Sequence, residues 1–168
     1  MVGKRGGTKS MTLHEAYRDN LEAANRFEDY VERKLYCKGL PVGVYRSLTF
    51  QKTYGESRAG IEIKYDLRFR ETGNLFIEFA ERHNKNVNMK PAGICGKGWG
   101  FCIGDYHKIW LFSMTMLKLL HANRSKYRVV EHDTAKGFLL PVEDADKHAI
   151  FLITEGEYDV GPDGRPIS

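Results

Sequence analysis

The chain has 168 residues, of which 42% are hydrophobic, and a formal net charge of +4. This length and apolar fraction suit one globular domain with a hydrophobic core, while the small basic excess does not by itself identify a polyanionic partner. No apolar run approaches the roughly 18 residues of a membrane span, and the basic start MVGKRGGTKS has no apolar segment typical of a secretory signal.

The number and spacing of the cysteines also argue against a secreted protein. The three cysteines, Cys37, Cys95 and Cys102, are odd in number and widely spaced, and they lack the spacing of a structural zinc site. They indicate free thiols in a reducing compartment. We therefore expect a cytoplasmic protein that is neither secreted nor bound to a membrane.

The first half of the chain predicts a helix followed by strands. We expect residues 1–10 to be a disordered basic arm, residues 11–160 a single domain and residues 161–168 a flexible tail. An amphipathic helix that ends before Gly39 and Pro41 is predicted by apolar residues at three- and four-residue steps, namely Leu21, Ala24, Phe27, Val31 and Leu35. Residues 42–55 are rich in β-branched and aromatic residues and predict a strand.

Two further strands, joined by the turn RFRETGN, predict a hairpin over residues 60–81. Residues 83–91 read as a polar loop, and residues 94–112 as a second hairpin that turns near Gly104 and Asp105. A helix near residues 113–123 and short strands at 127–132 and 136–142 complete the chain. The fold class expected from this order is α+β, with a central mixed β-sheet.

The glycine-rich stretch GICGKGWG at residues 93–100 lacks the pattern of a phosphate-binding loop. A turn or a close approach of two backbones is the better interpretation of these glycines.

Charged residues follow one face of the hairpin predicted over residues 60–81. Because side chains alternate along a strand, Glu62, Lys64 and Asp66 share a face. If the turn centres near Glu71, Lys64 lies opposite Glu78 and Asp66 lies diagonal to it, so two carboxylates could hold a Mg²⁺ ion. The alternative is a solvated hairpin face on which Lys64 and Glu78 form an ordinary cross-strand pair.

The order of a helix carrying RFEDYVERKL, strands, an aspartate at a strand end and an acid about a dozen residues later resembles the PD-(D/E)XK nuclease superfamily. The likeness covers roughly residues 20 to 115 and is strongest to small resolvase-like and phage-encoded members. It implies a restriction-endonuclease-like core and a DNA endonuclease dependent on Mg²⁺ or Mn²⁺, located in the host cytoplasm if it is phage-encoded.

The resemblance also implies individual roles. Asp66 matches the motif aspartate, Glu78 matches the acid of the (D/E)-x-K element, and Glu28 matches a glutamate that some members contribute from a helix. The metal would then be held by Asp66, Glu78 and the Phe79 carbonyl, with Glu28 as a further ligand.

Ala80 departs from the family pattern, because it stands where the motif lysine belongs. Lys64 is the candidate replacement, since it shares a face with Asp66. The motif can also be aligned in a second register along the sequence. Glu62-x-Lys64 is itself an E-x-K, and Glu56 would then be its upstream acid. A third possibility is that the site has lost catalysis and that the protein only binds nucleic acid.

DNA is the expected partner, held by basic residues around the site: Arg68, Arg70, Arg82, Lys85 and Lys97. A homodimer is possible, as in nucleases that cut both strands. The competing functions are a nucleic-acid-binding or anti-restriction protein on the same fold and, more distantly, a protein-interaction module.

Overall fold

The computed structural model describes residues 13–55, 57–123 and 126–155 and confirms the α+β class. Residues 1–10 and 161–168, expected to be an arm and a tail, lie outside these ranges. The helices are α1 (Leu13–Cys37), α2 (Leu48–Tyr54), α3 (Phe69–Thr72), α4 (Met114–Ala122) and α5 (Val142–His148), with a 3₁₀ turn η1 at Gly93–Cys95. The strands are β1 (Ile61–Tyr65), β2 (Asn74–Glu81), β3 (Lys90–Pro91), β4 (Gly100–Gly104), β5 (Lys108–Ser113), β6 (Val129–Glu131), β7 (Ala135–Pro141) and β8 (Phe151–Thr154).

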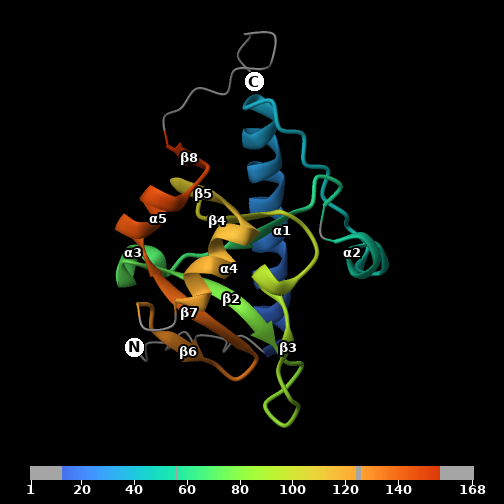
Figure 1. Cartoon of the computed structure of the whole chain (residues 1–168). Coiled ribbons are helices and arrows are strands. Elements are labelled where there is room, and N and C mark those ends of the chain that lie inside the picture. Colours follow the sequence, from blue (N-terminus) through green and yellow to red (C-terminus); the bar gives the residue numbers. More distant parts are fainter. Residues whose placement is uncertain (1–12, 56, 124–125, 156–168) are drawn as a thin grey trace, which may run out of the picture.

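The strands form two four-stranded sheets instead of the single central sheet that was expected. One sheet has the order β1-β4-β5-β8, with β1 parallel to β4, and the other is antiparallel with the order β3-β2-β7-β6. Figure 1 shows the long α1 running behind the sheets, while α4 and β7 lie at the front. Within the described residues, no helix combines the length and apolar character needed to cross a membrane.

The predicted N-terminal helix is confirmed as α1. Its residues Phe27, Val31 and Leu35 are fully buried and pack on one face of the β1-β4-β5-β8 sheet, whereas Leu21 at the same helical period is half exposed. The face that α1 covers carries Ile61 and the other members of this core, which are Ile63, Cys102, Ile109, Leu111 and Ile153.

The opposite face of this sheet packs on the second sheet. Along β4, Phe101 and Ile103 point into this second core, while Cys102 between them points to α1. The core is completed by residues from both sheets and from the helices, including Leu75, Ile77, Trp110, Phe112, Leu117, Phe138, Leu140 and Ala145. Because both faces are covered, all five residues of β4 are buried.

The strand expected over residues 42–55 is wrong, because most of that segment is loop and the helix α2. Val44 forms only an isolated bridge with Ser57, so this segment does not gain the ladder that a strand needs. The helix supplies its own hydrogen bonds, such as the one from Gln51 N to Ser47 O at 2.9 Å. Val42 is buried, but Thr49, Phe50 and Thr53 within α2 are exposed, so the helical part of the segment lacks the half-buried face that favours a strand.

The hairpin predicted over residues 60–81 is also wrong, because β1 and β2 belong to different sheets. The expected turn is the short helix α3, which buries Phe69 edge-on against Trp110 with ring centroids 5.0 Å apart. Gly73 ends α3 in the left-handed conformation. A tight turn would have exposed Phe69, so core packing favours the helix.

The later elements follow the prediction more closely. The hairpin of β4 and β5 turns at Gly104 and Asp105, where Asp105 Oδ1 accepts hydrogen bonds from the backbone N–H groups of His107 and Lys108. The helix near residues 113–123 is α4, and the two short strands are β6 and β7. The polar loop contains only the two-residue strand β3.

Candidate functional site

A cleft of about 220 Å³ opens beside the ends of β1 and β2. Its walls come from α2, both strands, β3 and the glycine-rich segment around η1. The lining residues are Gln51, Gly55, Glu62, Lys64, Glu78, Glu81, Pro91, Ala92, Gly93, Gly96 and Lys97. The mixture of carboxylates, ammonium groups and glycines distinguishes it from the apolar cores on either side.

Strand β1 supplies an ion pair to this cleft. Because Ile61 and Ile63 face α1, the alternate residues Glu62 and Lys64 point to the other side of the sheet. Lys64 Nζ lies 2.9 Å from Glu62 Oε1, and the Glu62 side chain is only 8% exposed. A carboxylate this deeply buried is costly unless it is paired, so the ion pair with Lys64 offsets part of the cost of burying Glu62.

Strand β2 brings Glu78 to the same cleft. The register of β2 against β7 shifts between Glu78 and Ala80, which is a β-bulge at Phe79. Burial raises the pKa of the Glu78 carboxyl, the Lys64 ammonium acts to lower it, and the negative charges of Glu62 and Glu81 add to the rise. The cleft is therefore an acidic cluster in which the carboxylates of Glu62, Glu78 and Glu81 outnumber the ammonium groups of Lys64 and Lys97.

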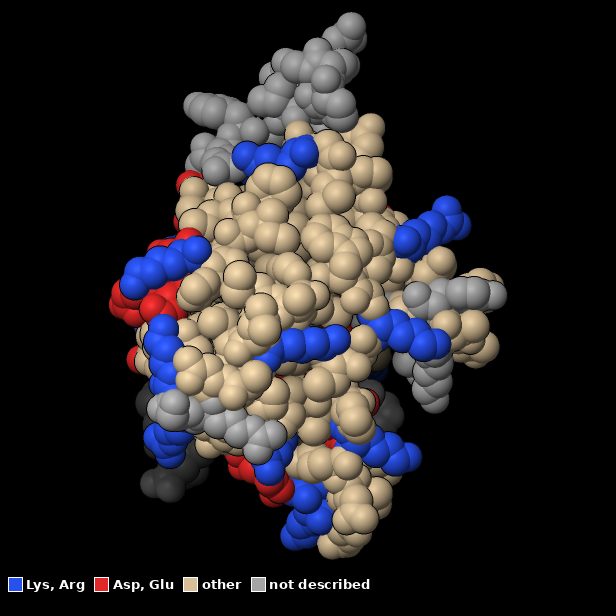
Figure 2. Space-filling view, viewed as in Figure 1, with Lys and Arg blue, Asp and Glu red and all other residues tan. Residues whose placement is uncertain are grey.

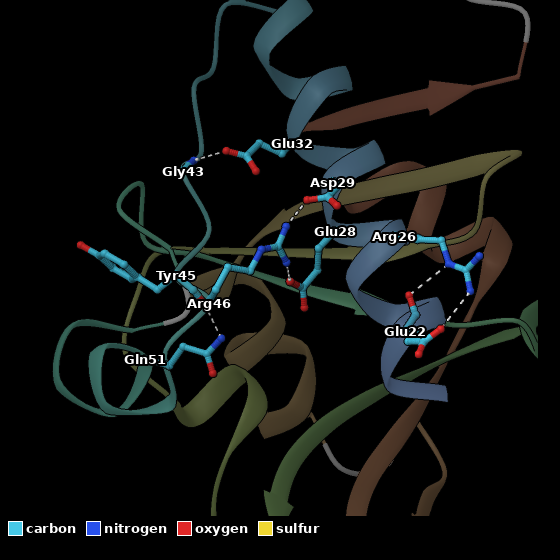
Figure 3. A network of polar contacts seen from close by, with 9 residues as sticks. All are labelled: Glu22, Arg26, Glu28, Asp29, Glu32, Gly43, Tyr45, Arg46 and Gln51. Carbon is cyan, nitrogen blue, oxygen red and sulfur yellow. Dashed lines mark hydrogen bonds and ion pairs between the residues drawn. The ribbon is translucent and has the colours of Figure 1, made fainter. Parts of the chain in front are cut away.

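Glu28 of α1 does not line the cleft, although the charge of Lys64 acts on it. Burial raises the pKa of Glu28, whereas Arg46 and Lys64 act to lower it. Arg46 Nη1 lies 2.8 Å from Glu28 Oε2, and Figure 3 shows this contact joining α1 to the segment that carries Arg46. Lys64 pairs directly with Glu62, and its charge also acts on Glu28 of α1 and Glu78 of β2.

Asp66, matched to the motif aspartate, is not among the residues that line this cleft. Its Oδ1 accepts a hydrogen bond from Arg68 N at 2.8 Å, and its Oδ2 accepts one from Phe76 N at 3.2 Å. These contacts turn the chain after β1 and tie it to β2. The acids that the cleft brings together are instead Glu62 and Glu78.

The other proposed ligands are placed as follows. The Phe79 carbonyl accepts a hydrogen bond from Ala92 N at 3.1 Å, and Ala80 pairs with Pro91 of β3. Glu56, the upstream acid of the second register, lies outside the described residues.

The basic residues expected to bind DNA are not gathered on one surface. Lys97 lines the cleft, and its Nζ donates a hydrogen bond to Thr53 O at 2.8 Å. Arg70 pairs with the buried Asp105, and Arg82 pairs with Glu131, so both contribute to the structure elsewhere. Arg68 and Lys85 are exposed. On the face shown in Figure 2, basic side chains are scattered and do not form a continuous patch.

The glycine-rich segment around η1 forms part of the cleft wall, whereas the sequence predicted only a turn or a close approach of two backbones there. Gly93 has a φ of +52°, and a β-carbon there would lie 2.2 Å from Glu78 O. A β-carbon at Gly96 would stand 3.7 Å from Glu62 Oε2. The close backbone approach expected from GICGKGWG is therefore confirmed, and it lies directly against the acidic cluster.

The donor set suits a hard divalent cation. Mg²⁺ takes one or two carboxylates together with water and substrate phosphate oxygens, and Glu62 and Glu78 supply carboxylates beside open space. In residues 13–55, 57–123 and 126–155, no three His, Cys, Asp or Glu side chains converge as a metal-binding group. Any such ion would thus rely on two protein carboxylates and on ligands from water or substrate.

Comparison of the chain with protein-family models, with curated proteins and with solved structures finds no match. The functional argument therefore rests on the geometry of the cleft.

Proposed function

We propose that the protein is a metal-dependent phosphodiesterase that hydrolyses the DNA backbone, with Glu62, Glu78 and Lys64 at its active site. The observation that carries the proposal is the ion pair of Lys64 with the buried Glu62 in an open cleft that Glu78 from the other sheet also lines. Placing the partly buried Glu78, whose pKa is raised by burial, beside the buried Glu62 is costly for stability, which is typical of a functional site.

Each residue has a separate role in this proposal. Glu62 and Glu78 would hold Mg²⁺ or Mn²⁺, which when bound supplies a Lewis acid for the phosphate and lowers the pKa of water. Lys64 would orient the attacking water and stabilise negative charge that develops on the phosphate. Its ion pair with Glu62 fixes the ammonium group at the cleft before substrate arrives.

The arrangement supports a PD-(D/E)XK-like site in which two roles of the motif are taken by residues other than those that the motif spacing indicates. Glu62, in place of Asp66, would act as the first acid, and Lys64, in place of Ala80, would act as the lysine. Glu78 keeps the role that the resemblance implies for it. Glu62 and Lys64 also form the E-x-K pair of the second register, so one short segment of β1 would supply an acid and the cation.

A nucleic-acid-binding protein without catalysis is the second candidate. It is favoured by the ion pairs that already occupy Glu62 and Glu28, with Lys64 and Arg46 respectively. In such a protein the cations would serve only to neutralise buried acids.

A cleavage assay on supercoiled, linear and branched DNA, with Mg²⁺ and with Mn²⁺, separates these candidates. We expect wild-type protein to cut at least one substrate and the Glu62→Gln and Glu78→Gln variants to lose that activity. Glu71→Gln, which changes an exposed acid of α3, is the control and should behave like wild type. DNA binding without cleavage by wild-type protein, or full activity in both cleft variants, would refute the nuclease proposal.

A further inference from the structure

Trp99 exposes a large aromatic side chain beside the cleft. This residue is 44% exposed, whereas the other tryptophan of the chain, Trp110, is fully buried. Trp99 does not line the cleft itself. It belongs to the glycine-rich segment that forms one wall, and it follows the cleft residue Lys97 by two positions. The exposed ring therefore lies next to the cleft and not on a remote surface.

The indole ring of Trp99 is held in one orientation. Its Nε1 donates a hydrogen bond to Ala59 O at 2.6 Å, and a β-carbon at Gly60 would lie 3.3 Å from its Cδ1. The backbone is fixed as well, because Trp99 N donates to Gly60 O at 2.8 Å and Trp99 O accepts from Met114 N at 2.7 Å. The protein thus satisfies the polar atom of the ring, so what the ring offers to a ligand is its aromatic carbon surface.

The pleat at the start of β4 places Trp99 on the face of the sheet that carries the acidic cluster. A β-carbon at Gly100 would lie 2.8 Å from Ile61 Cγ1, so Gly100 faces α1 and its neighbour Trp99 faces the other way. Glu62 also points away from α1. Because Ile61 pairs with Gly100, Trp99 lies level with Gly60, and Glu62 follows about 7 Å further along β1.

A rigid, exposed aromatic ring next to groups that bind phosphate is typical of proteins that bind single-stranded nucleic acid. The base stacks on the ring while the backbone is held by charge, and stacking accepts every base because each has an aromatic face. Lys97 supplies an ammonium group in the cleft beside Trp99. A base within a continuous duplex is already stacked between its neighbours and offers no free face to Trp99.

We infer that Trp99 stacks on an unpaired base whose phosphate lies in the cleft. The site then takes single-stranded DNA, or the unpaired end of a branched DNA, in preference to a continuous duplex. The inference rests on the proposed function for the place of the phosphate, and Trp99 adds the substrate class. If Trp99 only covered the start of β1 at Gly60, its replacement would lower stability without any effect that depends on the bases of the DNA.

The first measurement uses the tryptophan fluorescence of the wild-type protein, with EDTA present so that no DNA is cut. A short oligothymidine should quench the emission of Trp99, while the buried Trp110 keeps its own. An oligonucleotide of the same length and charge but without bases should bind about 5- to 100-fold more weakly, the range expected for the loss of stacking. It should quench little, as should a continuous duplex. Equal affinity and quenching with and without bases would refute the inference.

The second measurement compares variants, with a dye-labelled oligonucleotide as the probe. Trp99→Ala should weaken the binding of oligothymidine by about 5- to 100-fold and should leave the binding of the abasic oligonucleotide nearly unchanged. Trp99→Phe keeps an aromatic ring and should retain most of the affinity. Phe151→Ala is the matched control, because Phe151 is 41% exposed on β8, at the far edge of the same sheet, and it should bind oligothymidine like wild type.

The outcomes separate this inference from the nuclease proposal. If Trp99→Ala binds oligothymidine like wild type, or weakens oligothymidine and abasic DNA equally, the stacking inference is refuted and a nuclease that cuts duplex DNA still stands. If binding depends on Trp99 and on the bases but no substrate is cut, the inference holds and the nuclease proposal fails. If the wild-type protein binds no DNA, both fail. Should Trp99→Ala not fold, Trp99→Phe and the wild-type comparison with abasic DNA still decide the question.

Discussion

Gly93 packs so closely on Glu78 that a β-carbon at position 93 would lie 2.2 Å from the Glu78 carbonyl oxygen. The contact supports β2 at its bulge, where Glu78 enters the cleft. Since the obstructing atom belongs to the backbone, a larger residue here must displace the strand that carries the acid.

Gly93→Ala should therefore cost about 2–4 kcal/mol of unfolding free energy, from the clash and from the left-handed backbone. Gly73→Ala is the matched control, because Gly73 has a φ of +68° but no neighbouring atom within 4 Å of an added β-carbon. It should lose only about 1–2 kcal/mol. Urea unfolding measures both, and equal losses would contradict the packing argument.

The raised pKa of Glu78 gives stability a defined pH dependence. Burial raises this pKa above its unfolded value, so the folded protein binds the proton more strongly and stability falls as pH rises from the unfolded to the folded pKa. Glu78→Gln removes this loss. We expect the variant to melt at a higher temperature than wild type at pH 7, with a difference that shrinks toward pH 4. A difference in melting temperature that stays constant from pH 7 to pH 4 would contradict a raised pKa at Glu78.

Lys64→Met should leave the buried Glu62 carboxylate without the ammonium group that lies 2.9 Å away. We expect a loss of about 1–3 kcal/mol, because the buried carboxyl group of Glu62 then lacks its charged partner. The double variant Lys64→Met with Glu62→Gln should recover part of that loss, because no charge then remains to be neutralised. A double-mutant cycle by urea unfolding measures the coupling, and strictly additive effects would rule it out.

Turnover should respond to Lys64 more strongly than stability does. We expect Lys64→Met to reduce the single-turnover rate by about 10²- to 10³-fold, comparable to the loss of one group that stabilises transition-state charge. Lys64→Arg should restore little activity, because a planar fork does not reproduce a compact ammonium group. Near-normal rates in Lys64→Met would show that Lys64 is not the catalytic cation of the proposed site.

Asp144 provides a test far from the cleft. Hydrogen bonds from Lys126 and Tyr127 lower the pKa of Asp144 to about 2. Because the unfolded value is higher, near 3.9, this contribution to stability is present above about pH 4 and lost as pH falls toward 2. Titration followed by NMR should show the low pKa, and Asp144→Asn should weaken the acid dependence of unfolding. An ordinary pKa at Asp144 would show that these contacts do not persist in solution.

Local patterns in the sequence predicted the elements whose packing is also local. The three- and four-residue spacing of Phe27, Val31 and Leu35 indicated α1, and Gly104 with Asp105 indicated the turn between β4 and β5. The partner of β1 could not be found in this way, because β1 pairs with β4, about 40 residues further along the chain. A period of two shows which side chains share a face, but it does not show which strand lies alongside.

The same limit applies to the cleft. Alternation correctly placed Glu62 and Lys64 on one face, and the sequence suggested Glu78 as their neighbour. The choice of Asp66 followed from the spacing of a motif, whereas its side chain is taken up by the N–H groups of Arg68 and Phe76. The bulge at Phe79 and the contact with Gly93 depend on tertiary packing, which motif spacing does not encode.

The division of the strands into two sheets has a consequence for ion selectivity. Glu62 and Lys64 belong to the sheet of β4, while Glu78 belongs to the sheet of β7, and no backbone ladder joins β1 to β2 in the described part of the chain. A small rigid displacement of one sheet against the other therefore changes the distance between the two carboxylates without breaking a ladder hydrogen bond. If the proposed site holds a divalent cation, this arrangement lets the two carboxylates adapt to different ionic radii, and we expect the packing between the sheets to set the preference between Mg²⁺ and Mn²⁺.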